Sequence, residues 1–202
     1  FPEPPQPIAP RGRSDRYPPV ILTSAASAEL AKYAANVFLA ARVSLINEFA
    51  QVAEATGADI TEVARVVGSD DRIGPRFLKA GIGWGGSCFG KDAAAIRSLG
   101  HQHNLPMLMT EAVMHVNTSQ RGRIIAQAKR WLPTDGGTAT ILGLAFKAGT
   151  DDLRDSPGLA VASTLAAAGH TVQTHDPLAT MAAYQQYPLE PFLYYTDPYA
   201  AA

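Results

Sequence analysis

The 202-residue chain is 47% hydrophobic and carries a formal net charge of −1 at pH 7. A chain of this size can bury a core, and its balanced charge gives no electrostatic attraction to nucleic acid or to an anionic membrane. One cysteine excludes an intrachain disulfide, and no apolar run suits a bilayer span or a secretory signal. The cytoplasm is therefore the expected compartment.

The chain is predicted to open with a leader and to continue into one long helix. Residues 1–19 contain seven prolines and hardly any aliphatic residues, which predicts an extended or disordered leader. Val20–Thr23 is short and apolar and predicts a first strand. From Ser27, a candidate N-cap, no helix breaker occurs before Gly57, so a helix of about thirty residues and about 45 Å is expected. Such a helix is typical of a spine or a dimer seam.

Two polar residues of this helix, Lys32 and Asn36, lie four positions apart and therefore share a face. Both stand among alanines, which leave room for a ligand. From spacing alone, a surface lysine with an incidental asparagine is the simpler interpretation.

Two further helices are predicted before the chain changes character. One begins at Asp59, with Glu62 completing a capping box, and stops at Gly68. The other opens at Pro106 and reaches about Trp131. His115 and Asn117 lie within it and have no identifiable partner, so they are interpreted as satisfied polar groups.

Between these helices lies the most informative stretch, Gly81–Asp92, which places the only cysteine, Cys88, between a glycine cluster and a Lys-Asp pair. The apolar run that follows predicts a helix from near Lys91 to His103, with Cys88 just before its N-terminus. The partial positive charge at that terminus and the Lys91 ammonium favour thiolate over thiol, and so favour a nucleophile. Lone cysteines are usually inert packing, but an inert thiol needs neither glycines nor flanking charges.

Two other interpretations of this stretch are rejected. The Gly-x-Gly-x-x-Gly spacing from Gly81 matches a dinucleotide fingerprint, but that fingerprint must follow a strand, and Arg76–Ala80 is not a convincing strand. A zinc site fails because the histidines offer no ligand spacing beyond His101-x-His103, which is better explained as a polar helix end.

A domain boundary is predicted at Pro133–Gly137. It divides a central helical domain, 20–133, from a carboxyl-terminal α/β domain, 134–202.

The second domain is predicted to contain a βαβ unit. Strands are expected at Thr138–Leu144 and Thr171–Asp176, and a helix that begins at Ser156-Pro157 and ends at Gly169 is expected between them. Parallel strands place ligands at their carboxyl ends, which here means the loop 145–155. Lys147 and Arg154 in that loop suit phosphates, although a solvated charged loop fits the spacing equally well.

Three of these stretches resemble the UDP-glucose/GDP-mannose dehydrogenase family, over about residues 20–202. They are the segment from Asp71 through Asp92, the Ala-Glu-Leu-x-Lys-x-x-x-Asn pattern that contains Lys32, and Leu-Ala-Phe-Lys-x-x-Thr-Asp-Asp-Leu-Arg-Asp-Ser-Pro. Ser87 and Phe89 favour the UDP-glucose branch over the GDP-mannose branch.

The resemblance implies a mainly α central domain with a long spine helix, followed by a partial Rossmann-like, UDP-binding α/β domain. It implies an NAD-dependent four-electron oxidation of UDP-glucose to UDP-glucuronate, through a cysteine thiohemiacetal and thioester, in a homodimer formed through the long helix. Relatives begin with an NAD-binding Rossmann domain, whose glycine-rich turn does not precede the long helix here. The chain is therefore expected to be a central and early carboxyl-terminal fragment that stops two strands into the second sheet.

Site roles follow from the same resemblance. Cys88 is implied as the covalent nucleophile, and Lys32 and Asn36 as stabilisers of negative charge on the sugar C6 oxygen. Asp92 would orient or deprotonate the water that hydrolyses the thioester. Implied substrate contacts are Phe77, Leu78, Lys79, Ala80, Gly81, Gly85, Phe146 and Lys147, with Arg72 reaching the substrate of the neighbouring subunit. Lys91 and Arg154 are implied cofactor contacts.

Other functions stay open. The substrate could be GDP-mannose or another UDP-sugar, and the chain could be a nucleotide-sugar-binding or dimerising module without catalysis. A cysteine hydrolase would need His101 or His103 as its base, and no triad pattern is present.

Overall fold

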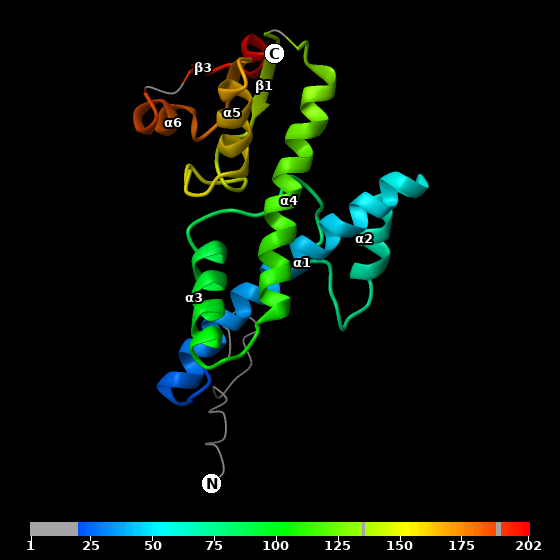
Figure 1. The fold of residues 1–202 in the computed structure, drawn as a ribbon, viewed down its shortest axis with the longest axis vertical. Coiled ribbons are helices and arrows are strands. Elements are labelled where there is room, and N and C mark those ends of the chain that lie inside the picture. The colour runs from blue at the N-terminus through cyan, green and yellow to red at the C-terminus, as the bar shows by residue number, and fades with distance from the viewer. Residues whose placement is uncertain (1–19, 135, 189–190) are drawn as a thin grey trace, which may run out of the picture.

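The computed structural model describes residues 20–134, 136–188 and 191–202, so the predicted leader at 1–19 lies outside the described residues. The chain forms a helical part followed by a small parallel α/β part (Figure 1). This is the fold class that the sequence predicted. None of the helices in the described ranges has the length and apolarity needed to cross a bilayer.

The helical part is built around α1, Ala25–Thr56, a 32-residue helix. It begins three residues earlier than predicted, because the hydroxyl of Ser24, not Ser27, caps it by accepting a hydrogen bond from the backbone N–H of Ser27 at 3.1 Å. Gly57 ends it in the left-handed conformation, with φ 75°. The strand predicted at Val20–Thr23 is wrong: these residues are exposed and form no strand.

Three helices pack on or beside α1. They are α2, Ile60–Gly68; α3, Phe89–Gln102; and α4, Leu108–Trp131. Asp59 caps α2 as predicted, by accepting from the backbone N–H of Thr61. The predicted starts of the other two were two residues off, because α3 begins directly after Cys88, and α4 begins only after Met107, whose φ is 41°.

The α/β part alternates strands and helices in one three-stranded parallel sheet of order β1-β2-β3. The elements are β1, Thr138–Leu142; α5, Pro157–Ala167; β2, Thr171–His175; α6, Thr180–Gln186; β3, Phe192–Tyr194; and the short α7, Pro198–Ala201. The expectation of two strands is therefore wrong. The three residues of β3 are too few to show a period, and their pairing with β2 is a tertiary contact.

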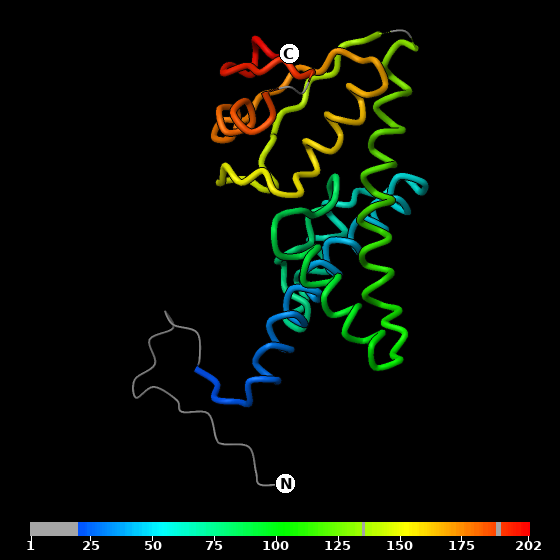
Figure 2. Tube along the Cα trace, turned by 60° about the vertical axis from the view of Figure 1, so that its left-hand side comes forward, coloured from blue at the N-terminus to red at the C-terminus, as the bar shows by residue number. Residues whose placement is uncertain are grey.

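The two parts share α4. In Figure 2 this helix runs beside both of them, and its last turns pack Ile124, Ile125, Ala128 and Leu132 against the core of the α/β part. That core includes Leu144, Leu165 and Val172, which are all but inaccessible. The helical part has a smaller cluster of Ala40, Trp84 and Val113. Because Trp84 belongs to the glycine-rich stretch, that stretch is built into the helical core.

Candidate active site

The glycine loop, residues 81–88, is held between α1 and α4 by buried amide side chains. Asn47 accepts a hydrogen bond from the N–H of Gly81 at 2.8 Å, and Gln120 donates to the carbonyl of Gly81 at 2.7 Å. Asn117 binds both backbone groups of Trp84, accepting from its N–H at 2.8 Å and donating to its carbonyl at 2.9 Å. These amides supply the partners that a loop backbone lacks when it is buried.

Sequence reasoning missed this role of Asn47, Asn117 and Gln120. The available signal was weak: Asn117 and Gln120 lie three positions apart on one helix, and so share a face. Nothing in the sequence connects that face to a loop more than thirty positions away.

Cys88 occupies the N-cap position of α3 and is exposed. Its sulfur lies 3.6 Å from the hydroxyl of Ser87, and its carbonyl accepts the N–H of Asp92 at 2.9 Å. Cys88 therefore lies directly before a helix N-terminus, as the sequence predicted.

Asp92, on the first turn of α3, is hydrogen-bonded to two of the other predicted catalytic residues, Lys32 and Asn36. Its Oδ2 accepts from Lys32 at 3.0 Å and from Asn36 at 2.5 Å, both on α1, and Lys91 lies 3.2 Å from its Oδ1. The Asp92 side chain is only 3% exposed, whereas Lys32 and Lys91 are largely exposed. A buried carboxylate on the first turn of α3 thus holds one amide and two ammonium groups.

The ionisation of Asp92 follows from two opposing effects. Burial raises the pKa of Asp92, but hydrogen bonds from Lys32, Asn36 and Lys91 outweigh burial and leave that pKa below its ordinary value. The same pairing raises the pKa of Lys91. Because the folded-state pKa of Asp92 is depressed, its contribution to stability is complete above the unfolded value, and is lost as pH falls through the folded value.

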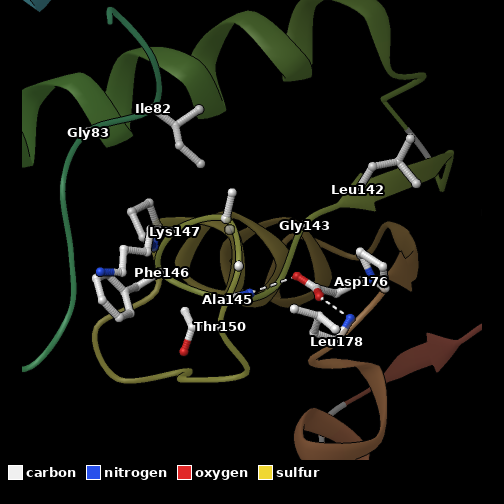
Figure 3. Close-up of a pocket in the computed structure, with 15 residues that line it drawn as sticks. Ile82, Gly83, Leu142, Gly143, Ala145, Phe146, Lys147, Thr150, Asp176 and Leu178 are labelled. Carbon is white, nitrogen blue, oxygen red and sulfur yellow. Dashed lines mark hydrogen bonds between the residues drawn. The ribbon is translucent and has the colours of Figure 1, made fainter. Parts of the chain in front are cut away.

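The loop after β1 brings Phe146 and Lys147 over the glycine loop. The Lys147 ammonium lies 5.2 Å from the centre of the Phe146 ring. Both residues line two neighbouring cavities, which also share Gly83. The strand-end cavity, about 350 Å³, lies at the carboxyl ends of β1 and β2 (Figure 3), and the thiol cavity, about 440 Å³, contains Cys88.

The two loops also touch directly. The N–H of Gly86 donates to the carbonyl of Arg154 at 3.0 Å, and Arg121 of α4 bridges the carbonyl of Trp84, at 2.7 Å, and the carboxylate of Asp155, at 2.8 Å. Gly85 packs so closely that an added Cβ would lie 2.0 Å from the carbonyl oxygen of Asp155. The glycine loop is therefore docked on the segment that leads into α5.

The structure brings only some of the predicted substrate residues to the cavities. Phe77, Gly85, Phe146 and Lys147 line the thiol cavity with Cys88. Neither cavity is lined by Arg72, Leu78, Lys79, Ala80 or Gly81. Leu78 is buried in the helical part, and Arg72 is exposed and paired with Asp70 at 2.6 Å.

Arg154 is held in the same way as Arg72, by the aspartate two residues before it. Its guanidinium makes a two-pronged pair with Asp152, at 2.9 and 2.6 Å, which holds the pKa of Asp152 at about 2 and raises the pKa of Arg154. Arg154 and Lys91 both lie near enough to Cys88 for their charges to interact with its sulfur. Each of these cations is at the same time paired with a carboxylate, Lys91 with Asp92 and Arg154 with Asp152.

The fold and the site together define a class of protein in which a helical part presents a thiol, on a glycine loop, to the ligand-binding edge of a parallel α/β part. The UDP-glucose/GDP-mannose dehydrogenase family models match here twice: the central domain over residues 26–119 and the UDP binding domain over residues 140–202. The chain belongs to this family.

Named relatives agree with that assignment. The chain is 45% identical over 184 residues to UDP-glucose 6-dehydrogenase TuaD of Bacillus subtilis, covering 91% of this chain and 40% of that protein. It is 41% identical over 171 residues to UDP-glucose 6-dehydrogenase AglM of Haloferax volcanii, covering 85% of this chain and 40% of that protein. The chain spans about 40% of the length of these curated relatives.

Solved structures show the same likeness. A UDP-glucose dehydrogenase from Pyrobaculum islandicum superimposes with a TM-score of 0.81 at 41% identity, covering 87% of this chain and 40% of that one. A GDP-mannose dehydrogenase from Pseudomonas aeruginosa gives a TM-score of 0.56 at 28% identity, covering 90% and 44%.

Proposed function

We propose that this chain carries the covalent-catalysis and nucleotide-sugar-binding parts of an NAD-dependent UDP-glucose 6-dehydrogenase. One observation carries the proposal: an exposed thiol at a helix N-terminus, flanked by Lys91 and Arg154, shares a cavity with Phe146 and Lys147 and lies beside buried Asp92. The relatives named as UDP-glucose 6-dehydrogenases support the substrate. The division into domains at 20–133 and 134–202 belongs to the same proposal, with α4 contributing to both cores.

The site fits a nicotinamide cofactor only in part. Within the described ranges, no strand is followed by a glycine fingerprint for a dinucleotide, because the turn after β1 runs Gly143-Leu-Ala-Phe-Lys. Lys91 and Arg154 are exposed cations beside Cys88, which suits contact with the phosphates of a cofactor held mainly by other residues. When bound, the cofactor accepts a hydride in each of the two oxidation steps.

The residues around Cys88 have distinct roles in the proposed reaction. Lys32 and Asn36 stabilise the negative charge that develops on the sugar C6 oxygen. The Cys88 thiolate adds to the C6 aldehyde left by the first oxidation, and the second oxidation turns this thiohemiacetal into a thioester. Water then breaks the carbon–sulfur bond, which releases the carboxylate and restores the thiol.

Asp92 is proposed to orient that water rather than to deprotonate it strongly. A general base works best when its pKa is near the working pH, and the pKa of Asp92 is below even the ordinary carboxyl value. Its firm hydrogen bonds to Lys32 and Asn36 suit an orienting group that also holds both side chains in place.

Substrate contacts are proposed on both sides of the cavities. Phe146 and Lys147 would contact the nucleotide diphosphate, with Lys147 as a point charge. Phe77, Leu78, Lys79, Ala80, Gly81 and Gly85 would form the sugar side. Arg72 is proposed to reach the substrate of a neighbouring subunit, and its exposed position away from both cavities is compatible with that role.

Among the other functions considered, a cysteine hydrolase fits the structure least. His101 and His103 lie at the far end of α3 from Cys88, about 20 Å along the helix, and His101 pairs with Glu111 at 2.9 Å. A nucleotide-sugar-binding or dimerising module without catalysis stays the second candidate. GDP-mannose or another UDP-sugar remains the alternative substrate.

The test of the proposal uses the reactivity of Cys88, the only thiol. Iodoacetamide should alkylate it in the folded chain at least several-fold faster than in the urea-unfolded chain at pH 7, because an exposed cysteine at a helix N-terminus near Lys and Arg side chains is in the setting typical of reactive cysteines. UDP-glucose should slow the reaction by covering the thiol cavity, and GDP-mannose should slow it less. A rate equal to that of the unfolded chain, unaffected by either nucleotide sugar, would exclude this function.

A homodimer through α1 is the second prediction. Leu30, Phe38, Leu45, Phe49 and Val52 are all exposed, and their spacing of eight, seven, four and three residues places them along one face of the helix. An apolar stripe of this length is typical of a surface that another chain covers. We expect a dimer at micromolar concentration in sedimentation, and a monomer for Phe49→Glu. Gln51→Glu, off the stripe, is the matched control, and a folded wild-type monomer would remove the prediction.

A further inference from the structure

Asp176 is a buried acidic residue, and the reaction proposed above gives it no role. It follows β2 directly, at the carboxyl edge of the sheet, and lines the strand-end cavity. Figure 3 shows its carboxylate between the backbone of Ala145 on one side and that of Leu178 on the other. It therefore lies between the two loops that form the walls of this cavity.

Both carboxylate oxygens of Asp176 are occupied by backbone amides. Oδ2 accepts from Leu144 at 2.8 Å and from Ala145 at 3.1 Å. Oδ1 accepts from Leu178 and from Ala179, each at 2.8 Å. In the described part of the chain no cation forms an ion pair with it. Burial raises the pKa of Asp176, but the four hydrogen bonds from backbone amides outweigh burial and leave this pKa below the ordinary value.

An acidic residue after the second strand has a different use in dinucleotide-binding folds, where it accepts hydrogen bonds from the ribose hydroxyls. Here each oxygen already takes two N–H groups, so a ribose hydroxyl would have to displace a buried backbone bond. The amides of Leu144 and Ala145 immediately precede Phe146 and Lys147, two of the three residues common to both cavities. The geometry points away from a ribose ligand and toward a brace.

We propose that Asp176 is a positioning residue, which fixes the backbone that carries Phe146 and Lys147 to the 177–179 loop and so shapes the site for a nucleoside diphosphate without touching its ribose. This inference rests on the proposed function of the strand-end cavity as a nucleotide site. Only aspartate meets the requirement, since asparagine would turn an NH₂ group toward one pair of amide donors. Glutamate is longer by one methylene group, which would move its carboxylate out of position for these amide donors.

The test is calorimetric titration of the chain with UDP and with 2′-deoxy-UDP. Asp176→Asn should weaken both nucleotides by the same factor, about 10- to 100-fold, while the preference for UDP over its deoxy form stays unchanged. In a Phe146→Ala/Lys147→Ala background the same substitution should cost less than about threefold, because the brace acts through those two side chains. Asp59→Asn, which alters the N-cap of α2, and Val172→Ala, which destabilises the α/β core, are the controls, and both should bind UDP like the wild type.

Four results would overturn the inference. Loss of the preference for UDP over 2′-deoxy-UDP in Asp176→Asn would make the residue a ribose ligand. An unchanged UDP affinity, or equal effects with and without the Phe146 and Lys147 side chains, would show that Asp176 does not act through this loop. If the wild-type chain binds no UDP, the proposed nucleotide site fails, and amide hydrogen exchange decides the brace separately. Exchange should then rise at Leu144, Ala145, Leu178 and Ala179 in Asp176→Asn, and a uniform rise like that of Val172→Ala would refute it.

Discussion

Asp92→Asn should leave a thioester on Cys88, in a protein that joins these residues to a nicotinamide-binding domain. The substitution keeps the size of the side chain but removes the charge that orients water. It also turns an NH₂ group toward the donors of Lys32 and Asn36, which now bind Oδ2. Hydrolysis should fall by roughly a hundredfold or more, the scale expected when a group acting on the reacting water is lost. Mass spectrometry after one turnover with UDP-glucose and NAD should show the adduct.

Cys88→Ser is the matched control for this trap. Without the thiol no thioester forms, so any released product should be at the aldehyde level and no adduct should appear. Normal turnover by Asp92→Asn would contradict the role given to the carboxylate. Asp92 would then serve only the first turn of α3, where an acidic side chain also stabilises the helix.

Gly85→Ala should separate the glycine loop from the segment before α5. The new methyl group would lie 2.0 Å from the carbonyl oxygen of Asp155 and 2.9 Å from the Pro157 ring, and backbone at this junction has little room to move. Overpacking of this kind costs about 1–3 kcal/mol. A loss of that size should lower the melting temperature by roughly 2–12 °C for a domain of this length.

The matched control is Gly81→Ala in the same loop. An added Cβ there meets nothing within 4 Å, so the melting temperature should stay close to that of the wild type. Hydrogen exchange at the Gly86 amide should rise only in Gly85→Ala, because that amide donates across the junction to Arg154. Equal melting temperatures for the two variants would show that the docking seen here contributes little to stability.

Local signals explain most of what the sequence predicted correctly. Asp59, Ser156 and Gly57 mark helix ends through bonds or backbone angles within a few residues, so each could be identified without the fold. The errors arose where local choices compete. Ser24 and Ser27 are both good caps three residues apart, and only the hydrogen bond from Ser27 to Ser24 decides between them.

Roles in the site divide along the same line. Cys88 at the start of a helix, among glycines and beside Lys91, could be inferred from adjacent residues, and family resemblance added Lys32, Asn36 and Asp92. Their convergence is a tertiary fact, since Asn36 and Asp92 are 56 positions apart. The depressed pKa of Asp92 follows from that convergence, because the hydrogen bonds from Lys32, Asn36 and Lys91 outweigh the effect of burial, which raises it.

The sequence by itself therefore determined helices α1 to α5, strands β1 and β2, and the placement of Cys88 directly before a helix. These features depend on backbone preferences, caps and breakers that act over a few residues. Only the tertiary structure decided what satisfies the buried backbone of the glycine loop, which carboxylate accepts from the Leu144 and Ala145 amides, and where the two loops dock. Asn117, Asp176 and Arg121 have these roles because burial requires a partner for every polar group, and the fold selects which distant residue supplies it.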